Sequence, residues 1–311
     1  MIYHVFANRS NIGDWLSAKG IQKLTGEVEI TECLCDEPFV EETIKTLSVA
    51  GENDLVIIGG GGLLMDYFLP FWKAFLPIAE RVPFVILGIG YCDIKHEPSL
   101  PPKDIVEEVI SKAALCIVRD KLSQTYLQHL ELPEPVPCPS IYAIPATALA
   151  GRDILQVNNY TTCGAEAYET MRAAGQKYAA DKGITFRETN NRIEQGSEEQ
   201  LAHLLSLYAR SEIIISSALH GCIIGVAMGR TVLAVSGDRK IESFMEAVGM
   251  QDQVIDASMC SIFEERLFNL QDGRPDMSVV DEIREKNIGI AELLRKKFSH
   301  LMGKAALGPF L

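Results

Sequence analysis

The chain has 311 residues, of which 47% are hydrophobic and 23% are charged, as in an ordinary globular protein. This length is ample for two hydrophobic cores. The formal net charge of −13 argues against a nucleic-acid-binding surface, which requires clustered Lys and Arg, but it permits a local site for an anionic ligand. We therefore expect no nucleic-acid partner.

Eight cysteines without a CxxC pair indicate buried thiols in a reducing compartment. Cys33 and Cys35 alternate along a predicted strand without further ligands, so neither a metal nor a cofactor is expected. The first apolar run is too short for a signal peptide, and prolines and charged residues interrupt the most apolar region, residues 63–84. These features predict a soluble, cytoplasmic protein.

Short apolar runs alternate with helical patterns through the first half of the chain. Strands are expected near Ile2–Phe6, Val28–Cys33, Leu55–Ile58, Phe84–Leu87 and Cys116–Val118. Helices are expected near Trp15–Leu24, Glu41–Val49, Leu63–Ala79, Ile105–Ala113 and Ser123–His129. This order predicts parallel strands joined by right-handed crossover helices.

Five prolines between Leu132 and Pro145 then indicate a stiff linker, because proline fixes φ and lacks an amide donor. Beyond it, strands are expected near Ile154–Val157, Ile184–Glu188, Ile213–Ser216, Val232–Val235 and Gln253–Ile255. Helices are expected near Ala165–Ala180, Glu198–Tyr208, Leu219–Met228, Ile241–Val248 and Asp281–Met302.

The predicted fold class is therefore α/β, with two Rossmann-like, doubly wound parallel-sheet domains that face a cleft. The first domain is expected over residues 1–138 and the second over residues 139–290. Residues 291–311 are expected to form a C-terminal helix that packs back on the first domain.

Four glycines, ending in Gly60-Gly61-Gly62, follow the apolar run Leu55–Ile58. Glycine permits positive φ and lets a ligand approach backbone amides, so we expect an anion-binding turn at a helix N-terminus here. A tight turn without a ligand is the alternative. The run matches neither the dinucleotide fingerprint, which Leu64 breaks, nor a P-loop, because no Lys-Ser/Thr pair follows.

Polar residues also follow the first and fifth predicted strands. Asn11 and Asp14 open a helix, where each is either an N-cap or a substrate contact. Arg119 ends the fifth strand beside Asp120, and the alternative to a ligand role is a solvated ion pair or a helix cap.

The segment Glu212–Phe244 carries the clearest site pattern. One apolar strand ends before Ser217-Ala218-Leu219-His220-Gly221, and the next ends before Asp238-Arg239-Lys240. Ligands of parallel sheets bind beyond the carboxyl ends of the strands. We therefore predict a site that contains His220, the alternative being a buried structural histidine.

Taken together, these motifs resemble the polysaccharide pyruvyl transferase family. The resemblance covers most of the chain and follows the order NIGD, DLVIIGGGGLL, GIGY, CIVRDKLSQTYL and SSALHGCIIGVAMGRTVLAVSGDRKIESFMEAVGM. It implies a GT-B-like fold and transfer of an enolpyruvyl-derived group from phosphoenolpyruvate to a glycan or lipid-linked sugar, which forms a pyruvate ketal.

The resemblance also implies roles for individual residues. His220 would contact the donor and act as the acid, Arg239 and Lys240 would neutralise phosphate, and Asp14 with Gly60–Gly62 would face the acceptor. Further expected substrate contacts are Asn11, Arg119, Asn159, Ser217, Leu219 and Gly221.

The chain departs from the family pattern at three positions. Ala218 stands where members carry an arginine, Asn159 ends a strand that often ends in arginine, and Cys138-Pro139 replaces Asp-Pro. Lost guanidinium groups remove bidentate anchors for phosphate or carboxylate. Arg119, Arg187 and Arg192 are the candidate substitutes.

Two other functions stay open at this point. One is a GT-B transferase with a nucleotide-sugar donor, for which Glu188 or Glu242 would bind the ribose. The other is a catalytically silent glycan-binding or assembly protein. The segment Phe68–Ala79 is expected to be a buried crossover helix, with peripheral membrane contact as the alternative. The sequence leaves a homo-oligomer open.

Overall fold

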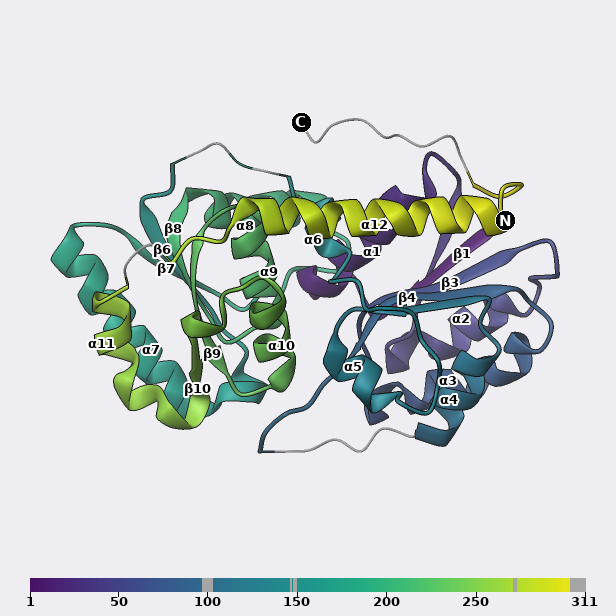
Figure 1. Ribbon diagram of the computed structural model, residues 1–311, viewed down its shortest axis with the longest axis horizontal. Coiled ribbons are helices and arrows are strands. Elements are labelled where there is room, and N and C mark those ends of the chain that lie inside the picture. Colours follow the sequence, from purple (N-terminus) through teal and green to yellow (C-terminus); the bar gives the residue numbers. More distant parts are fainter. Residues whose placement is uncertain (97–102, 146, 148–149, 271–272, 303–311) are drawn as a thin grey trace.

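Two parallel five-stranded sheets, one in each half of the chain, form the framework of the molecule (Figure 1). The computed structural model describes all residues except 97–102, 146, 148–149, 271–272 and 303–311. Almost every strand residue in the centres of the two sheets is buried, which explains why these runs are continuously apolar instead of alternating.

The first sheet has the strand order β2-β1-β3-β4-β5. Its strands are β1 (Ile2–Phe6), β2 (Ile30–Leu34), β3 (Leu55–Leu64), β4 (Phe84–Tyr91) and β5 (Leu115–Val118). Its helices are α1 (Ile12–Thr25), α2 (Val40–Leu47), α3 (Leu69–Ala79), α4 (Lys103–Ser111) and α5 (Lys121–Tyr126), with short 3-10 turns η1 (Glu37–Phe39) and η2 (Asp66–Phe68).

The second sheet repeats the pattern with the order β10-β9-β8-β6-β7. The connecting segment contains α6 (Ser140–Ala143), and the strands are β6 (Asp153–Val157), β7 (Phe186–Thr189), β8 (Ser211–Ser216), β9 (Thr231–Ser236) and β10 (Val254–Asp256). The helices are α7 (Tyr160–Lys182), α8 (Glu198–Arg210), α9 (Leu219–Ala227), α10 (Arg239–Ala247), α11 (Phe263–Phe268) and α12 (Met277–Lys297), with η3 (Gln251–Gln253) and η4 (Ala257–Ile262).

The four-glycine run is the main correction to the predicted fold. It forms no strand-to-helix turn, because β3 continues through the glycines to Leu64 and α3 begins only at Leu69. Gly61 pairs with Ile89 of β4, and the register then shifts before Leu64. Gly60 and Gly61 have φ values of 84° and 94°, so glycine is required for this irregular strand and not for a helix N-terminus.

The apolar helix α3 packs into the core of the first domain. Phe71, Trp72 and Phe75 are fully buried, and the Trp72 indole N–H donates to the Leu63 carbonyl. Its aromatic residues therefore supply core packing, as expected for a crossover helix. Within the described residues, no helix combines the length and apolar character needed to span a membrane.

The two domains share a hydrophobic core. Phe6, Ile12 and Trp15 of the first domain belong to the same buried cluster as Leu155 and Ile223 of the second. The long helix α12 adds to this connection, because Ile283 packs in the shared cluster whereas Ile290 and Leu294 pack with the first sheet. Figure 1 shows α12 running across both domains. The predicted domain limit at residue 138 lies between the two sheets, whereas the limit at residue 290 falls inside α12, which begins at Met277 and ends at Lys297.

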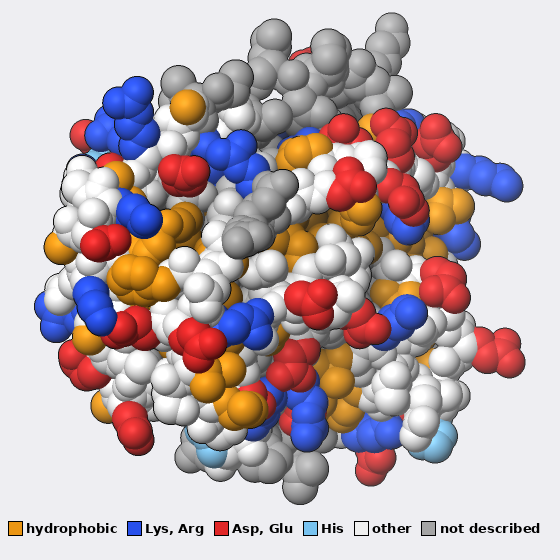
Figure 2. Space-filling view, turned by 60° about the vertical axis from the view of Figure 1, so that its left-hand side comes forward, with side chains coloured by type: hydrophobic (Ala, Val, Ile, Leu, Met, Phe, Trp, Pro, Cys, Tyr) orange, Lys and Arg blue, Asp and Glu red, His pale blue; other side chains and the backbone are white. Residues whose placement is uncertain are grey.

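Charges of both signs are mixed on the exposed face drawn in Figure 2. Lys and Arg side chains alternate there with Asp and Glu, with apolar atoms between them, in spite of the net charge of −13. This face therefore carries no single-sign field of the kind that binds nucleic acid.

Candidate functional site

A pocket of about 480 Å³ lies between the domains, at the carboxyl ends of strands from both sheets. We call it the cleft pocket. It is lined by Asn8, Asn11, Asp14, Asp36, Gly62, Met65, Tyr67, Phe68, Cys92 and Arg119 of the first domain and by Asn158, Asn159, Tyr160, Thr161, Asn190, Asn191, Arg192, Ala218, Leu219, His220 and Lys240 of the second.

Two backbone contacts join the domains beside the cleft pocket. At one, the Ile12 N–H donates to the Asn191 carbonyl (3.1 Å) and the Ile193 N–H donates to the Ser10 carbonyl (2.9 Å). At the other, the Lys95 N–H donates to the Gly237 carbonyl (3.0 Å). The lining residues extend from the first contact to the second.

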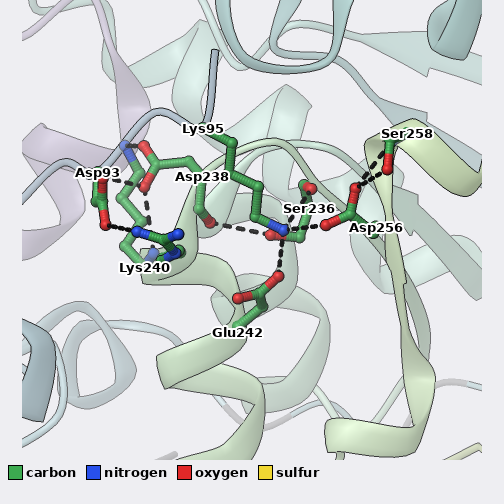
Figure 3. Close-up of polar contacts among 9 residues, drawn as sticks. Asp93, Lys95, Ser236, Asp238, Lys240, Glu242, Asp256 and Ser258 are labelled. Atoms are coloured by element: carbon green, nitrogen blue, oxygen red, sulfur yellow. Dashed lines mark hydrogen bonds and ion pairs between the residues drawn. The ribbon is translucent and has the colours of Figure 1, made fainter. Parts of the chain in front are cut away.

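Side chains strengthen the second contact, which Figure 3 shows in close-up. Lys95 of the first domain reaches across to Glu242 and Asp256 of the second, and Arg239 pairs with Asp93 at 2.7 Å. The hydrogen bond from Lys95 lowers the pKa of Asp256 to about 2. We refer to Asp93–Lys95 and its partners as the clasp.

His220 sits at the start of α9, directly against the first domain. A Cβ at Gly13 would overlap the His220 ring, so the glycine of the NIGD motif is required for this approach. The Cys138 Sγ lies 3.7 Å from His220 Nε2. Burial, followed by the charges of Arg119 and Lys240, lowers the pKa of His220 to about 3, so the imidazole is neutral at pH 7 without a ligand.

Arg119, which is buried, and Lys240, whose side chain is 13% exposed, are the two least exposed cations of the cleft pocket. Arg119 is 5% exposed, and its Nε pairs with Asp120 at 3.3 Å, whereas its buried Nη2 has no hydrogen-bond partner among the described residues. Lys240 Nζ lies 2.6 Å from Asp238 Oδ2 and 3.2 Å from Cys92 Sγ. An unsatisfied guanidinium N–H in a pocket is a ready donor for an anionic ligand.

Asp14 lies near these cations on the first turn of α1. Burial raises its pKa to about 6, and Arg119 opposes that shift. The carboxylate is therefore more basic than an ordinary aspartate while it is still largely ionised at neutral pH.

Glycines of the first sheet make room for these side chains. A Cβ at Gly61 would lie 2.6 Å from Asp14 Oδ1, and a Cβ at Gly90 would overlap the Arg119 guanidinium. These glycines therefore leave space for the side chains of Asp14 and Arg119. The sequence had predicted a different role, in which the glycine backbone contacts a ligand directly.

The predicted residues fall into two groups. Asn11, Asp14, Gly62, Arg119, Asn159, Leu219, His220 and Lys240 line the cleft pocket. Ser217 and Gly221 lie behind it, since Ser217 Oγ accepts from the Asn159 N–H (2.8 Å) and Gly221 packs against Val157. Gly60 packs on α1 beside Ser17, and Gly61 lies next to Asp14 behind the pocket wall.

Arg239 is the clearest misplacement. It is absent from the pocket lining, and its side chain is 60% exposed in the pair with Asp93. Successive helix residues point about 100° apart, so at the start of α10 Lys240 faces the pocket and Arg239 faces away.

Of the three arginines expected to replace the missing guanidinium groups, two lie in the pocket and one lies outside it. Arg119 and Arg192 line the cleft pocket, whereas Arg187 pairs with Asp153 outside it at 3.1 Å. Ala218, where the family resemblance implies an arginine, lines the pocket as well.

Several lining residues were missed at the sequence level. Asn190 and Asn191 directly follow β7, so the strand-end rule alone would have found them. Cys92 directly follows β4 and meets the same rule. Tyr67 and Tyr160 lie in η2 and at the start of α7, and only the folded arrangement brings them to one pocket. Among the described residues, no group of three His, Cys, Asp or Glu side chains is arranged to hold a metal ion.

A sequence model of the polysaccharide pyruvyl transferase family matches residues 8–239, about three quarters of the chain. The chain belongs to this family. The matched region includes every lining residue of the cleft pocket except Lys240. Comparison with curated proteins finds no match.

Solved structures share the fold of this family member. S. aureus MnaA, solved with UDP, aligns with a TM-score of 0.58 and 11% identity over 97% of this chain and 98% of its own. The UDP-GlcNAc 2-epimerase of Methanocaldococcus jannaschii, solved with UDP-GlcNAc and UDP, gives 0.52 and 10% over 95% and 99%. A Klebsiella pneumoniae protein of uncharacterised function gives 0.53 and 14% over 81% and 92%. These likenesses establish a GT-B-like fold and not a ligand.

Proposed function

We propose that this family member transfers an enolpyruvyl-derived group from phosphoenolpyruvate to a sugar of a cell-surface polysaccharide or its precursor. Family membership supports a transferase, and the cleft pocket supplies the groups that this reaction needs. The free thiols of all eight cysteines suit a reducing compartment, so we propose that it acts in the cytoplasm.

The unpaired Arg119 Nη2, in the same pocket as the Lys240 ammonium group, is the observation that carries the proposal. Phosphoenolpyruvate bears a phosphate and a carboxylate, and both accept charge-assisted hydrogen bonds from such groups. Arg119 supplies one of the guanidinium groups that Ala218 and Asn159 lack. A bound dianion would also offset the charges that lower the pKa of His220.

The proposed reaction then divides between His220 and Asp14. With the anion bound, His220 takes up a proton and delivers it to the methylene carbon of phosphoenolpyruvate. A sugar hydroxyl oxygen bonds to the adjacent carbon as Asp14 accepts its proton. A second hydroxyl of the sugar displaces phosphate, which leaves with the C–O bond electrons and a proton, and the pyruvate ketal remains.

A nucleotide-sugar transferase is the main competitor, because two structural neighbours were solved with UDP. The acidic residues expected to bind its ribose are otherwise engaged. Glu188 accepts from Tyr168 and pairs with Arg172 at 3.2 Å, and Glu242 belongs to the clasp. Neither lines the cleft pocket.

The test is a turnover assay with phosphoenolpyruvate and a neutral hexose-containing glycan. Phosphate release that depends on the glycan, with a ketal methyl signal in the product NMR spectrum, supports the proposal. We expect His220→Ala to abolish both signals. Thermal stabilisation by UDP, with no stabilisation by phosphoenolpyruvate, would favour the nucleotide-sugar transferase, and no response to either would favour a silent glycan-binding protein.

A further inference from the structure

Asparagine is the commonest residue type in the cleft pocket. Six asparagines line it, after three strand ends in both domains: Asn8, Asn11, Asn158, Asn159, Asn190 and Asn191. Every one of their Oδ1 atoms accepts a hydrogen bond from the protein itself. The side-chain oxygens are therefore already occupied, mostly by backbone N–H groups of loops and of the first turns of helices.

The Nδ2 donors show the opposite pattern. Asn8 Nδ2 donates to Asp36 Oδ2 at 2.7 Å, but the other five find no acceptor in the described part of the chain. Backbone N–H groups fix the amide orientation of Asn11, Asn159 and Asn190, because only the side-chain oxygen can accept from them. The pocket thus presents neutral N–H donors to its contents.

Asn191 is the most constrained of these donors. It is 4% exposed, and its Nδ2 is a buried donor without a partner among the described residues. The hydroxyl of the fully buried Tyr208 donates to Asn191 Oδ1 at 2.8 Å and so orients the amide. The backbone of Asn191 has φ 58°, a left-handed conformation that seldom occurs outside glycine and that concentrates at functional sites.

Two exposed tyrosines accompany these amides. Tyr67 of the first domain is 47% exposed, Tyr160 of the second is 55% exposed, and both line the cleft pocket. A tyrosine ring presents an apolar face with a polar edge, which suits the C–H face of a pyranose ring and its hydroxyl rim. Exposed aromatic rings next to unfilled amide donors indicate a ligand of that type.

The Asn8 and Asn11 loop and the Asn190 and Asn191 loop lie side by side, joined by the backbone contacts of Ile12 and Ile193, and Asp36 and Arg192 are their charged neighbours. His220 is affected by Arg119 and Lys240, whereas Asp14 is affected by those cations and also by Asp36 and Arg192. We call Arg119, Lys240 and His220 the anion end of the pocket and Asn8, Asn11, Asn190 and Asn191 the amide end, and the Asp14 carboxylate is within electrostatic range of charged residues at both. The Asp14 carboxylate can accept hydrogen bonds from sugar hydroxyl groups, and the asparagine Nδ2 groups can donate hydrogen bonds to sugar hydroxyl oxygens.

We infer that the amide end of the cleft pocket binds a neutral pyranose, and that Asn191 is a specificity-determining residue oriented by Tyr208. This inference rests on the proposed function, in which the sugar is the acceptor. Asn191 donates Nδ2–H to a sugar hydroxyl oxygen. Tyr208 does not touch the sugar and acts as a positioning residue.

The test measures binding of methyl β-D-galactopyranoside and methyl α-D-glucopyranoside to the full chain by saturation-transfer NMR titration. Phosphoenolpyruvate affinity is measured in parallel by calorimetry. Asn191→Gly removes the amide but accepts the left-handed backbone, so the Ile12 hydrogen bond is retained. Asn269→Gly, at an exposed position outside the pocket, is the matched control.

We expect Asn191→Gly to weaken glycoside binding about tenfold and to change phosphoenolpyruvate affinity by less than about twofold. Tyr208→Phe should weaken glycoside binding about threefold with the same phosphoenolpyruvate affinity, a split that a general packing defect would not produce. Asn269→Gly should change neither.

Unchanged glycoside binding in Asn191→Gly overturns the inference. The inference is also overturned if the wild-type protein binds phosphoenolpyruvate but neither glycoside. In that case the proposal that phosphoenolpyruvate is the donor is retained. If glycoside binding depends on Asn191 but phosphoenolpyruvate does not bind, the sugar site is supported. The same result contradicts the proposal that phosphoenolpyruvate is the donor.

Discussion

His220 of the second domain lies against the Cα of Gly13 in the first, so closely that a Cβ at residue 13 would overlap the imidazole. The contact joins the two motifs NIGD and SSALHG, which are separated by about two hundred residues of chain. It places a neutral histidine beside Asp14, Arg119 and Lys240 only when the domains are packed together.

Gly13→Ala should therefore displace His220 from the pocket. We expect a loss of stability of about 1–3 kcal/mol from overpacking and a fall in turnover of about a hundredfold from misplacement. Gly289→Ala is the control, because a Cβ at that helical glycine meets no atom within 4 Å. It should leave turnover unchanged and raise the thermal midpoint slightly. Equal behaviour of the two variants in both assays would contradict the contact.

The ionised Asp14 carboxylate should lower the free energy of unfolding at neutral pH. Its folded pKa is raised from 3.8 to about 6, so the stability linked to this group is full below pH 3.8 and is lost as pH rises through about 6. Each pKa unit corresponds to about 1.4 kcal/mol, so Asp14→Asn should gain at most about 3 kcal/mol at pH 8.

That gain should disappear near pH 4 in denaturant titrations, while turnover is lost at every pH because the base is gone. Asp181→Asn, at an exposed carboxylate outside the cleft pocket, is the matched control for the substitution itself. An Asp14→Asn effect of equal size at pH 4 and pH 8 would show that the carboxylate is not held in a raised-pKa site.

Most of the fold was predictable because buried parallel strands are short apolar runs between helical patterns. The order of strands and helices, the GT-B-like class and the family were all predicted from that alternation and its motifs. The glycine run was misread because glycines after an apolar strand suit a turn equally well. Only pairing with β4, a contact between distant segments, decides that the strand continues to Leu64.

The site was predictable where strand ends carry it. The structure places five predicted residues in the cleft pocket, as expected for residues that follow strands of parallel sheets: Asn11, Arg119, Asn159, His220 and Lys240. The choice between Arg239 and Lys240 depends on helix orientation. The orienting role of Tyr208 depends on a hydrogen bond from another element, so neither was visible locally.

Ala218 marks a place where donor binding should be improvable. It caps α9 and lines the cleft pocket without a charge of its own. Ala218→Arg should tighten phosphoenolpyruvate binding about tenfold in calorimetry by adding one charge-assisted contact. Ala218→Met, which adds similar bulk without charge, should not tighten it. Equal or weaker affinity in the arginine variant would mean that the donor phosphate or carboxylate does not bind at the start of α9.

The clasp should protect backbone hydrogen bonds between the domains. Lys95→Met removes the contacts to Glu242 and Asp256 that Figure 3 shows. Two amides donate across this contact, that of residue 95 to the Gly237 carbonyl and that of Arg239 to the Asp93 carbonyl (3.1 Å). We expect both to exchange about fivefold faster, which corresponds to about 1 kcal/mol for a partly exposed ion pair. Lys177→Met, which breaks the exposed pair with Glu264 inside the second domain, should leave those amides unchanged. Identical exchange rates in both variants would show that the clasp does not protect these amides.

Phosphoenolpyruvate binding to matched arginine variants tests the central claim most directly. Arg119→Met should weaken binding at least about tenfold in calorimetry, and Arg119→Lys should weaken it less, because lysine keeps the charge without the planar fork. Arg187→Met, at the arginine paired with Asp153 outside the pocket, should bind as the wild type does. Thermal midpoints measured alongside separate lost binding from lost folding. A folded Arg119→Met variant with wild-type affinity, or a wild-type chain that does not bind phosphoenolpyruvate, would contradict the proposed donor site.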